Sequence, residues 1–262
     1  ILIQYMIKKR ILAGVIVKDN QVVQSIGYRN YLPIGKPEIV VGNLDRWQAD
    51  EILINVIDRS NLNKGPDLEI LKKINNMNIQ TPLIYGGGIS KLEDAIKVIK
   101  LGADRIVLES IVEENYMELV KISQIIGSQS IVISMPLSIN KNKILFYDYK
   151  KKKEIEISNF FLNAIKNKLF SELLIVDYKN QGFMNGFNTE ILKKFTYDVP
   201  IILYGGISSK KNIETILVDK RVSALTFGNS LNYSEHSIQK IKNFDKKNFF
   251  REPYFQKDIK NA

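Results

Sequence analysis

Two glycine-rich turns contain the residues of this chain that are best suited to bind a charged ligand. The first is Gly86-Gly87-Gly88 and the second is Gly205-Gly206, and each follows a short apolar run that begins with a proline. Consecutive glycines at the end of a buried strand let the backbone approach a ligand closely, and the N–H groups there can bind an anion. The pair of turns therefore predicts two phosphate-binding sites.

Short apolar runs alternate with helical patterns along the chain and must position these turns. Strands are expected at 10–17, 51–57, 82–85, 104–108, 130–134, 172–176, 200–203 and 224–227. A long polar loop is expected after the first strand, and a hairpin at 137–150 after the fifth. Parallel strands joined by helices form an α/β fold, and eight such units in 262 residues predict a (βα)8 barrel. A doubly wound open sheet is the main alternative.

The two halves of the chain resemble copies of one unit. The word Glu-Ile-Leu-Lys-Lys occurs at 69–73 and again at 190–194, and at the same offset Gly65 aligns with Gly186. The glycine turns recur with nearly the same spacing, so we predict a duplicated half-barrel. The expected parts are one barrel domain over 1–262, half-barrels at about 7–127 and 128–245, and a C-terminal tail at 246–262.

Composition excludes several classes of site. The chain has 45% hydrophobic residues, which is enough for a full core, but no cysteine and a single histidine, His236. Disulfides, thiolate metal sites and histidine-based metal centres are therefore excluded, and we expect neither a metal nor a cofactor. No apolar run reaches the roughly 18 residues that span a bilayer, and the opening apolar segment is too short for a signal peptide. We expect a cytoplasmic protein that does not interact with membranes.

The net charge of +10 is compatible with nucleic acid or with small anions as partners. The lysines are scattered, however, and the densest cluster, Lys150–Lys153, follows the expected hairpin as a solvated tip does. We therefore expect no nucleic-acid partner. The partner favoured by the glycine turns is a phosphorylated small molecule.

In a barrel of this type, ligands bind at the C-terminal ends of the strands. The phosphate-binding residues expected there are Gly87, Gly88, Ser110, Gly182, Gly205, Gly206, Gly228 and Asn229. Two sites facing each other across the barrel mouth would suit an elongated bis-phosphorylated substrate. The alternative is that these glycines serve only tight turns.

Several motifs together resemble the cyclase subunit of imidazole glycerol phosphate synthase. They are Arg10-Ile-Leu with Lys18-Asp19, Gly102-Ala103-Asp104-Arg105, Gly127-Ser128-Gln129, and Gly182 and Gly186 with Thr189-Glu190, and the similarity extends from about 7 to 245. The resemblance implies a (βα)8 barrel of the ribulose-phosphate-binding type that forms a heterodimer with a glutaminase. In that family, a lyase of histidine biosynthesis, ammonia enters through the bottom of the barrel and reacts at the top with a bis-phosphorylated ribonucleotide.

The chain departs from this family at the acid–base pair. The resemblance places Ile16 and Pro136 where the family has two catalytic aspartates, and neither side chain can transfer a proton. A family lysine is replaced by Gln24. Two carboxylates near the expected mouth, Asp19 and Asp58, are the candidate catalytic residues, with roles in loops or turns as the alternative.

Charged residues begin four of the apolar strands, at the opposite end of the expected barrel. They are Arg10, Glu51, Arg105 and Glu172. Such residues are usually a solvated rim, but two arginines and two glutamates could also pair and close the floor. The resemblance places them on the family's ammonia gate, and it places Asp104 and Gln129 on the glutaminase-docking face.

Three functions are compatible with these features. The first is a paralogue that delivers ammonia for sugar amidation in surface-polysaccharide (lipopolysaccharide) biosynthesis, with a separate sugar amidotransferase as a further partner. Asp58-Arg59-Ser60 and the segment 31–35 resemble that branch of the family. The second is an active cyclase of histidine biosynthesis that uses other acid–base residues. The third is a non-catalytic activator of a glutaminase.

Overall fold

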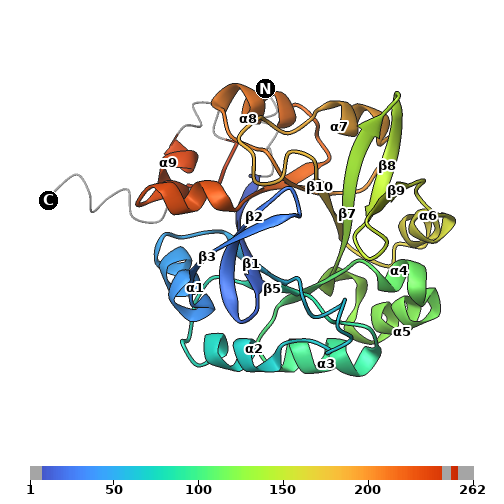
Figure 1. The fold of residues 1–262 in the computed structure, drawn as a ribbon, viewed down its shortest axis with the longest axis horizontal. Coiled ribbons are helices and arrows are strands. Elements are labelled where there is room, and N and C mark those ends of the chain that lie inside the picture. Colours follow the sequence, from blue (N-terminus) through green and yellow to red (C-terminus); the bar gives the residue numbers. More distant parts are fainter. Residues whose placement is uncertain (1–7, 244–248, 253–262) are drawn as a thin grey trace, which may run out of the picture.

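Eight parallel strands form a closed ring at the centre of the molecule (Figure 1). The computed structural model describes residues 8–243 and 249–252. In hydrogen-bonded order the strands are β1 (Arg10–Lys18), β4 (Glu51–Val56), β5 (Leu83–Gly86), β6 (Arg105–Leu108), β7 (Ile131–Asn140), β10 (Glu172–Asp177), β11 (Ile201–Tyr204) and β12 (Val222–Phe227). Pairing of β12 with β1 closes the ring, so the predicted (βα)8 barrel is confirmed over the alternative of an open sheet.

Helices lie between successive strands and surround the barrel (Figure 1). They are α1 (Pro37–Arg46), α2 (Leu68–Asn75), α3 (Leu92–Lys100), α4 (Ile111–Glu114), α5 (Tyr116–Ile126), α6 (Asn159–Lys166), α7 (Glu190–Lys194), α8 (Lys210–Ile216) and α9 (Ser237–Asn243), with the 3-10 turns η1 (Ser128–Ser130) and η2 (Asn229–Tyr233). Helix α1 begins at Pro37, as predicted, because proline suits a first helical turn whose N–H groups have no partner within the helix. Helix α2 is capped by Asp67, whose Oδ1 accepts from the Ile70 N–H at 3.1 Å.

Antiparallel strands extend the sheet beyond the C-terminal ends of β1 and β7. They are β2 (Gln21–Ile26) and β3 (Asn30–Gly35) after β1, and β8 (Lys143–Asp148) and β9 (Lys153–Ile155) after β7. The hairpin of β7 and β8 was predicted, but the prediction of a polar loop after β1 was wrong. Asp19 and Asn20 have φ of 49° and 60°, and Gly27 and Tyr28 have φ of 59° and 60°. Lys18 pairs with Gln21, so Asp19 and Asn20 form a two-residue turn, and positive φ at both positions of such a turn favours a hairpin. Ile26 pairs with Asn30, so a three-residue loop that includes Gly27 and Tyr28 connects β2 to β3.

The barrel interior is a separate apolar cluster from the layer between strands and helices. It contains Leu12, Ile16, Leu53, Ile84, Val107, Val132, Leu174, Val176, Ile202, Tyr204 and Ala224 of the barrel strands, with Val23 of β2. Alternation along each strand directs these side chains inward and their neighbours outward against the helices. The interior therefore separates the two ends of the barrel by an apolar layer.

The internal duplication is visible in the packing of the glycine turns. A Cβ on Gly88 would lie 2.2 Å from the carbonyl oxygen of Gly65, and a Cβ on Gly206 would lie 2.7 Å from that of Gly186. Both positions have left-handed φ, +74° at Gly88 and +75° at Gly206. In each half, a turn glycine packs against the carbonyl of a second glycine, and these second glycines, Gly65 and Gly186, align in the sequence repeat. The close contact and the positive φ both require glycine in the turn.

Most of the predicted C-terminal tail, 246–262, lies outside the described residues. Within the described part, Phe250 is buried and forms a parallel bridge with Lys9 beside the start of β1. This segment returns to the N-terminal end of the barrel, where the strands begin.

Candidate functional site

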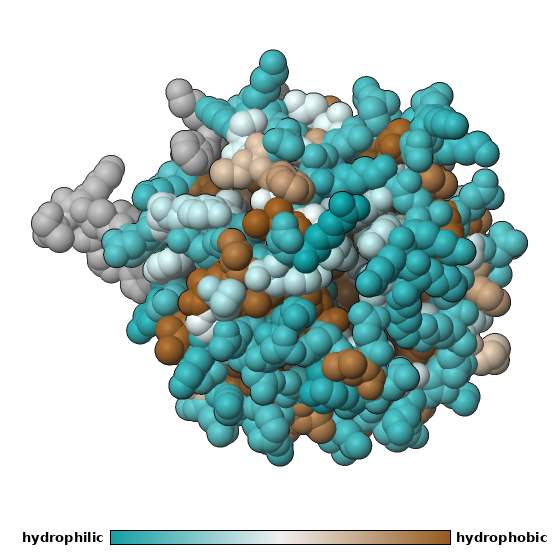
Figure 2. All heavy atoms as spheres, viewed as in Figure 1, coloured by the Kyte–Doolittle hydropathy of each residue, from teal (hydrophilic) through white to brown (hydrophobic). Residues whose placement is uncertain are grey.

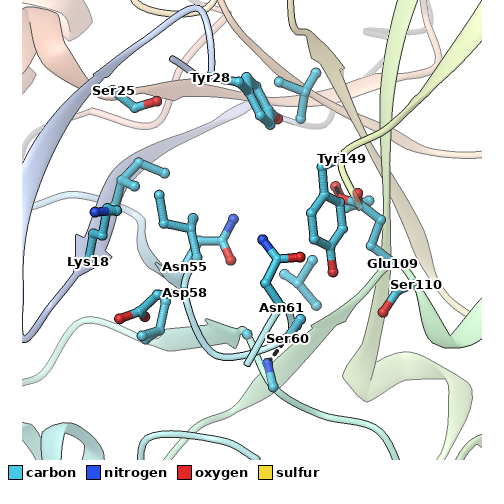
Figure 3. A pocket seen from close by; sticks show the side chains of 18 of the residues that line it. Lys18, Ser25, Tyr28, Asn55, Asp58, Ser60, Asn61, Glu109, Ser110 and Tyr149 are labelled. Atoms are coloured by element: carbon cyan, nitrogen blue, oxygen red, sulfur yellow. Dashed lines mark hydrogen bonds between the residues drawn. The ribbon is translucent and has the colours of Figure 1, made fainter. Parts of the chain in front are cut away.

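A cavity of about 810 Å³ opens at the C-terminal ends of β1, β4, β5, β6 and β7 (Figure 3). Its deepest wall is apolar and includes Ile16, Leu53, Val107, Leu174 and Val176 of the barrel interior. Its polar wall includes Lys18, Asp19, Asn55, Asp58, Ser60, Asn61, Glu109, Ser110 and Lys152. A pocket with an apolar base and a few convergent polar groups has the usual character of a small-molecule site.

The first glycine turn lies in the wall of this cavity. Gly87, Gly88 and Ser110 all line it, which is the location that the sequence predicted. The Gly88 N–H donates to Ser60 Oγ at 3.0 Å, so a serine hydroxyl accepts from the backbone group that an anion could use instead. The hydroxyl of Tyr149 interacts with Ser60 and Ser110, and burial raises the pKa of Tyr149 to about 12.

Two residues predicted for the second phosphate site, Gly182 and Asn229, pack against the hairpin of β2 and β3. The residues Gly182, Gly205, Gly206, Gly228 and Asn229 follow β10, β11 and β12 at the same end of the barrel, as predicted, but none of them lines this cavity. Instead, Asn229 Nδ2 donates to the Ser25 carbonyl at 2.9 Å, and the Gly27 N–H donates to the Gln181 carbonyl at 2.8 Å. The hairpin of β2 and β3 therefore lies against Gly182 and Asn229, and a Cβ on Gly182 would lie 2.2 Å from the Ser25 carbonyl oxygen.

Ile16 and Pro136, which the resemblance predicted at the positions of the family's acid–base pair, lie in an apolar setting. Ile16 lies in the barrel interior with Val23 and is 8% exposed, although it forms part of the cavity wall. Pro136 is buried on β7 and pairs in register with Val176 of β10. Neither position offers a titratable group to the cavity.

The two candidate carboxylates from the sequence meet on one side of the cavity. Asp19 and Asp58 both line it, and the Asp19 N–H donates to Asp58 Oδ2 at 3.1 Å. The Asp19 side chain is 75% exposed and pairs with Lys18 at 2.9 Å, whereas Asp58 Oδ1 is buried and has no hydrogen-bond partner among the described residues. Of the two, Asp58 is the carboxylate that the protein leaves partly unsatisfied at the cavity.

Sequence reasoning missed a third carboxylate, Glu109. It follows the last residue of β6 and lines the cavity, and Ser134 of β7 donates to its Oε2 at 2.6 Å. Burial raises the pKa of Glu109 to about 7; the hydrogen bond from Ser134 opposes this shift and the charge of Asp148 adds to it. The available signal was its place immediately before Ser110, at the C-terminal end of a predicted strand.

Tyrosines connect the two hairpins above the mouth. The rings of Tyr147 and Tyr178 stack at a centroid distance of 4.3 Å, and Tyr28 meets both edge-on at 5.9 and 6.2 Å. The Tyr178 hydroxyl donates to Glu154 of β9, which also pairs with Lys179 at 2.7 Å. These rings thus pack three segments together above the cavity mouth: the turn between β2 and β3, strand β8, and the loop after β10.

The opposite end of the barrel carries a ring of ion pairs formed by the four predicted gate residues. Arg10 contacts Glu51 at 2.9 Å and Glu172 at 2.5 Å. Arg105 contacts Glu172 at 2.6 Å and Glu51 at 3.8 Å. The four side chains are between 11% and 15% exposed, so they form a nearly buried floor instead of a solvated rim.

The ring is electrostatically uneven. Burial outweighs the arginines at Glu51 and raises its pKa, and Glu51 Oε2 has no hydrogen-bond partner. Burial also opposes ionisation of Glu172, but hydrogen bonds and charges from Arg10 and Arg105, together with Ser223, lower the pKa of Glu172. The ion pair between Arg105 and Glu51 is therefore the weakest of the four in this ring.

The two predicted docking residues lie beside this floor. The Leu83 N–H donates to Asp104 Oδ2 at 2.8 Å, and the side chains of Asp104 and Gln129 are exposed. The Gln129 carbonyl accepts from Ser171 Oγ at 3.2 Å, and the same Oγ accepts from Arg105 Nη2 at 2.9 Å. Two hydrogen bonds thus connect the predicted docking surface to a gate arginine.

The face that contains the cavity mouth is mostly hydrophilic, with apolar side chains among the polar ones (Figure 2). Several exposed apolar residues belong to segments at this end, including Leu32 of β3 at 54%, Leu62 at 53% and Phe183 at 45%. Over residues 8–243 and 249–252, no helix has both the length and the apolar character needed to cross a bilayer.

Comparison with known proteins identifies the family. Residues 10–237 match the family described as "Histidine biosynthesis protein". The "Putative imidazole glycerol phosphate synthase subunit hisF2" of Vibrio vulnificus is 26% identical over 236 residues, which cover 89% of this chain and 86% of that relative. The "Imidazole glycerol phosphate synthase subunit HisF" of Natranaerobius thermophilus is 24% identical over 243 residues, which cover 91% and 96%. The resemblance predicted from the sequence is thereby confirmed, and the chain belongs to the histidine biosynthesis protein family.

Proposed function

We propose that this chain conducts ammonia from a glutaminase to the barrel mouth, for amidation of a sugar in surface-polysaccharide biosynthesis, and that it does not catalyse the cyclase reaction. The observation that carries the proposal is a contrast between the two ends of one barrel. The floor has a complete ring of Arg10, Glu51, Arg105 and Glu172. The mouth has Ile16 where the family's first acid–base residue would be.

The floor supports a role in admitting a small molecule. Four charges that neutralise one another in pairs can separate and re-form, and their weakest contact, 3.8 Å between Arg105 and Glu51, offers a point of opening. The hydrogen-bonded path from Gln129 through Ser171 to Arg105 would let a protein bound at the floor influence that contact. A glutaminase at this surface would release ammonia next to the ring.

The barrel interior supports passage of neutral ammonia. The layer that contains Leu12, Leu53, Val132 and Leu174 is apolar, and burial of an unpaired charge in such surroundings costs many kcal/mol. The apolar layer therefore disfavours ammonium, and the proposal requires that neutral NH3 crosses it. Ammonia that crosses this layer enters the cavity at the mouth.

Two features argue against the cyclase reaction. Ile16 and Pro136 cannot transfer protons at the positions that the family uses. The hairpin of β2 and β3 also packs against Gly182 and Asn229, so a bis-phosphorylated substrate would find part of its second anchor occupied.

The test uses the full chain purified with the glutaminase from its own organism. We expect a stable complex that hydrolyses glutamine but does not cyclise the bis-phosphorylated ribonucleotide, while a cyclase subunit with both aspartates serves as the positive control. With the sugar amidotransferase added, amide-15N-labelled glutamine should transfer 15N to the sugar even in excess 14N-ammonium. Robust cyclisation, or dilution of the label by bulk ammonium, would contradict the proposal.

Asp58 favours one alternative, a cyclase with different acid–base residues. Its Oδ1 is buried at the cavity without a partner, which is a costly arrangement unless a ligand uses it. This alternative requires cyclase turnover by the wild-type complex that Asp58→Asn abolishes. Under our proposal there is no such turnover to lose.

A further inference from the structure

The carboxyl group of Glu109 is held so that one oxygen is used by the protein and the other is not. Ser134 Oγ donates to Oε2 at 2.6 Å from the neighbouring strand β7. Within the described ranges no donor reaches Oε1, and no lysine or arginine forms an ion pair with this residue. The side chain is half-buried in the wall of the cavity, beside Tyr149 in Figure 3.

The groups that surround Glu109 favour a carboxyl that gains and loses a proton near neutral pH. Tyr28 and Tyr149 face it from the two hairpins, and Asp148 adds a negative charge from the end of β8. Desolvation and Asp148 raise the pKa of Glu109 to about 7 against the hydrogen bond from Ser134. A general acid or base works best when its proton affinity matches the working pH in this way.

The same cavity has an anchor for one anion. The Gly87-Gly88 turn and Ser110 line the wall near Glu109, and Lys18 and Lys152 also line it. Among the described residues, Asp19 is the acidic residue that forms an ion pair with Lys18, and none forms one with Lys152. The amides of Asn55 and Asn61 also line it and can bond to hydroxyl groups. None of the residues predicted for the second phosphate site lines this cavity, and Asn229 is bonded to Ser25, which favours a ligand with one phosphate.

We infer that the cavity is a reaction site for a sugar with a single phosphate, in which Glu109 Oε1 exchanges a proton with a hydroxyl or amine of the ligand and Ser134 is its positioning residue. In the forward step the ligand's O–H or N–H bond breaks and its electron pair remains on that oxygen or nitrogen. The proton passes to Oε1, and the carboxylic acid then returns it to water. This inference goes beyond ammonia conduction, because it assigns chemistry to this chain.

The test labels carboxyl groups of the full chain with a water-soluble carbodiimide and glycinamide, followed by peptide mass spectrometry. Carbodiimides react with the protonated acid, and at pH 7 a carboxyl with a pKa near 7 is about a hundredfold more protonated than an ordinary glutamate. We expect Glu109 to be labelled at least about tenfold faster than the exposed Glu114 of α4, despite its lower exposure. Ribose 5-phosphate should suppress labelling of Glu109, and ribose should not.

Calorimetry on the same protein separates the two parts of the inference. Ribose 5-phosphate should bind the wild type and Glu109→Gln, and absence of binding to the wild type overturns the ligand class. Binding without protection of Glu109, or labelling no faster than at Glu114, overturns the role of Glu109.

Ser134→Ala should move the pH midpoint of Glu109 labelling upward, because the lost hydrogen bond favours the ionised form, and Ser134→Thr should restore the midpoint. An unchanged midpoint in Ser134→Ala contradicts the positioning role. None of these results depends on a glutaminase, so they are independent of the test of ammonia conduction.

Discussion

Arg105 Nη1 lies 2.6 Å from Glu172 Oε2 and thereby connects β6 of the first half-barrel to β10 of the second, across the intervening β7. Arg10 contacts the other oxygen of the same carboxylate at 2.5 Å. One glutamate thus forms ion pairs with two nearly buried arginines, and both halves of the barrel contribute to one floor. This arrangement makes Glu172 the central residue of the ring.

Removal of Glu172 should strongly destabilise the protein. In Glu172→Ala, Arg10 and Arg105 lose their closest partner while remaining nearly buried, and breaking a buried pair in this way typically costs about 3–5 kcal/mol. Urea denaturation would measure the change in the free energy of unfolding. The matched control is Glu114→Ala, which breaks the exposed pair with Lys150 and should cost less than about 1 kcal/mol. Equal effects of the two substitutions would show that the ring contributes no special stability.

Substitution of Gly88 should damage both the fold and the anion site. A Cβ there would lie 2.2 Å from the Gly65 carbonyl at a φ of +74°, so we expect Gly88→Ala to lose about 2 kcal/mol or more of stability and to bind ribose 5-phosphate at least tenfold more weakly. Gly35→Ala is the control, because a Cβ at Gly35 would meet no atom within 4 Å. Thermal unfolding and calorimetry would measure the two effects. Wild-type affinity in a folded Gly88→Ala variant would place the ligand elsewhere.

Glu109 should make stability depend on pH between about 4.5 and 7. Its pKa is raised to about 7 in the folded state, so the folded protein retains a proton that the unfolded chain has already lost over this interval. Stability of the wild type should therefore fall as pH rises, and Glu109→Gln should remove this slope. We expect Glu109→Gln to gain roughly 2–3 kcal/mol relative to the wild type between pH 5 and pH 8. Parallel stability curves for the two proteins would show that Glu109 titrates normally.

The predicted docking surface can be tested without disturbing the barrel. Asp104→Asn keeps an oxygen that can accept from the Leu83 N–H and removes only the charge, and Gln129→Ala truncates an exposed side chain. We expect each to weaken glutaminase binding by about tenfold, or about 1.4 kcal/mol, in a calorimetric titration. Asp19→Asn at the opposite end of the barrel should leave the affinity unchanged. Equal affinities for all three variants would place the glutaminase on another surface.

The sequence predicted the frame of the site because its signals are local. Proline, an apolar run and consecutive glycines specify a buried strand and a tight turn within a few residues, so Gly87 and Gly205 were correctly placed at strand ends. The segment after β1 was misjudged since its strands are short and partly polar. The turn between these strands depends on the positive φ of Gly27 and Tyr28, and the residue types alone do not specify that conformation at a tyrosine.

The sequence by itself determined the barrel, its duplication and the charged residues at the strand starts, because periodicity and charge can be followed along the chain. Only the tertiary structure decided which side chains meet at the mouth of the barrel. The contact between Ser134 and Glu109 depends on the pairing of β6 with β7, and the contact between Ser25 and Asn229 depends on the β2–β3 hairpin folding back over the barrel end. The pKa of a carboxyl depends on what surrounds it in space, and so Glu109 was visible only once the barrel had closed.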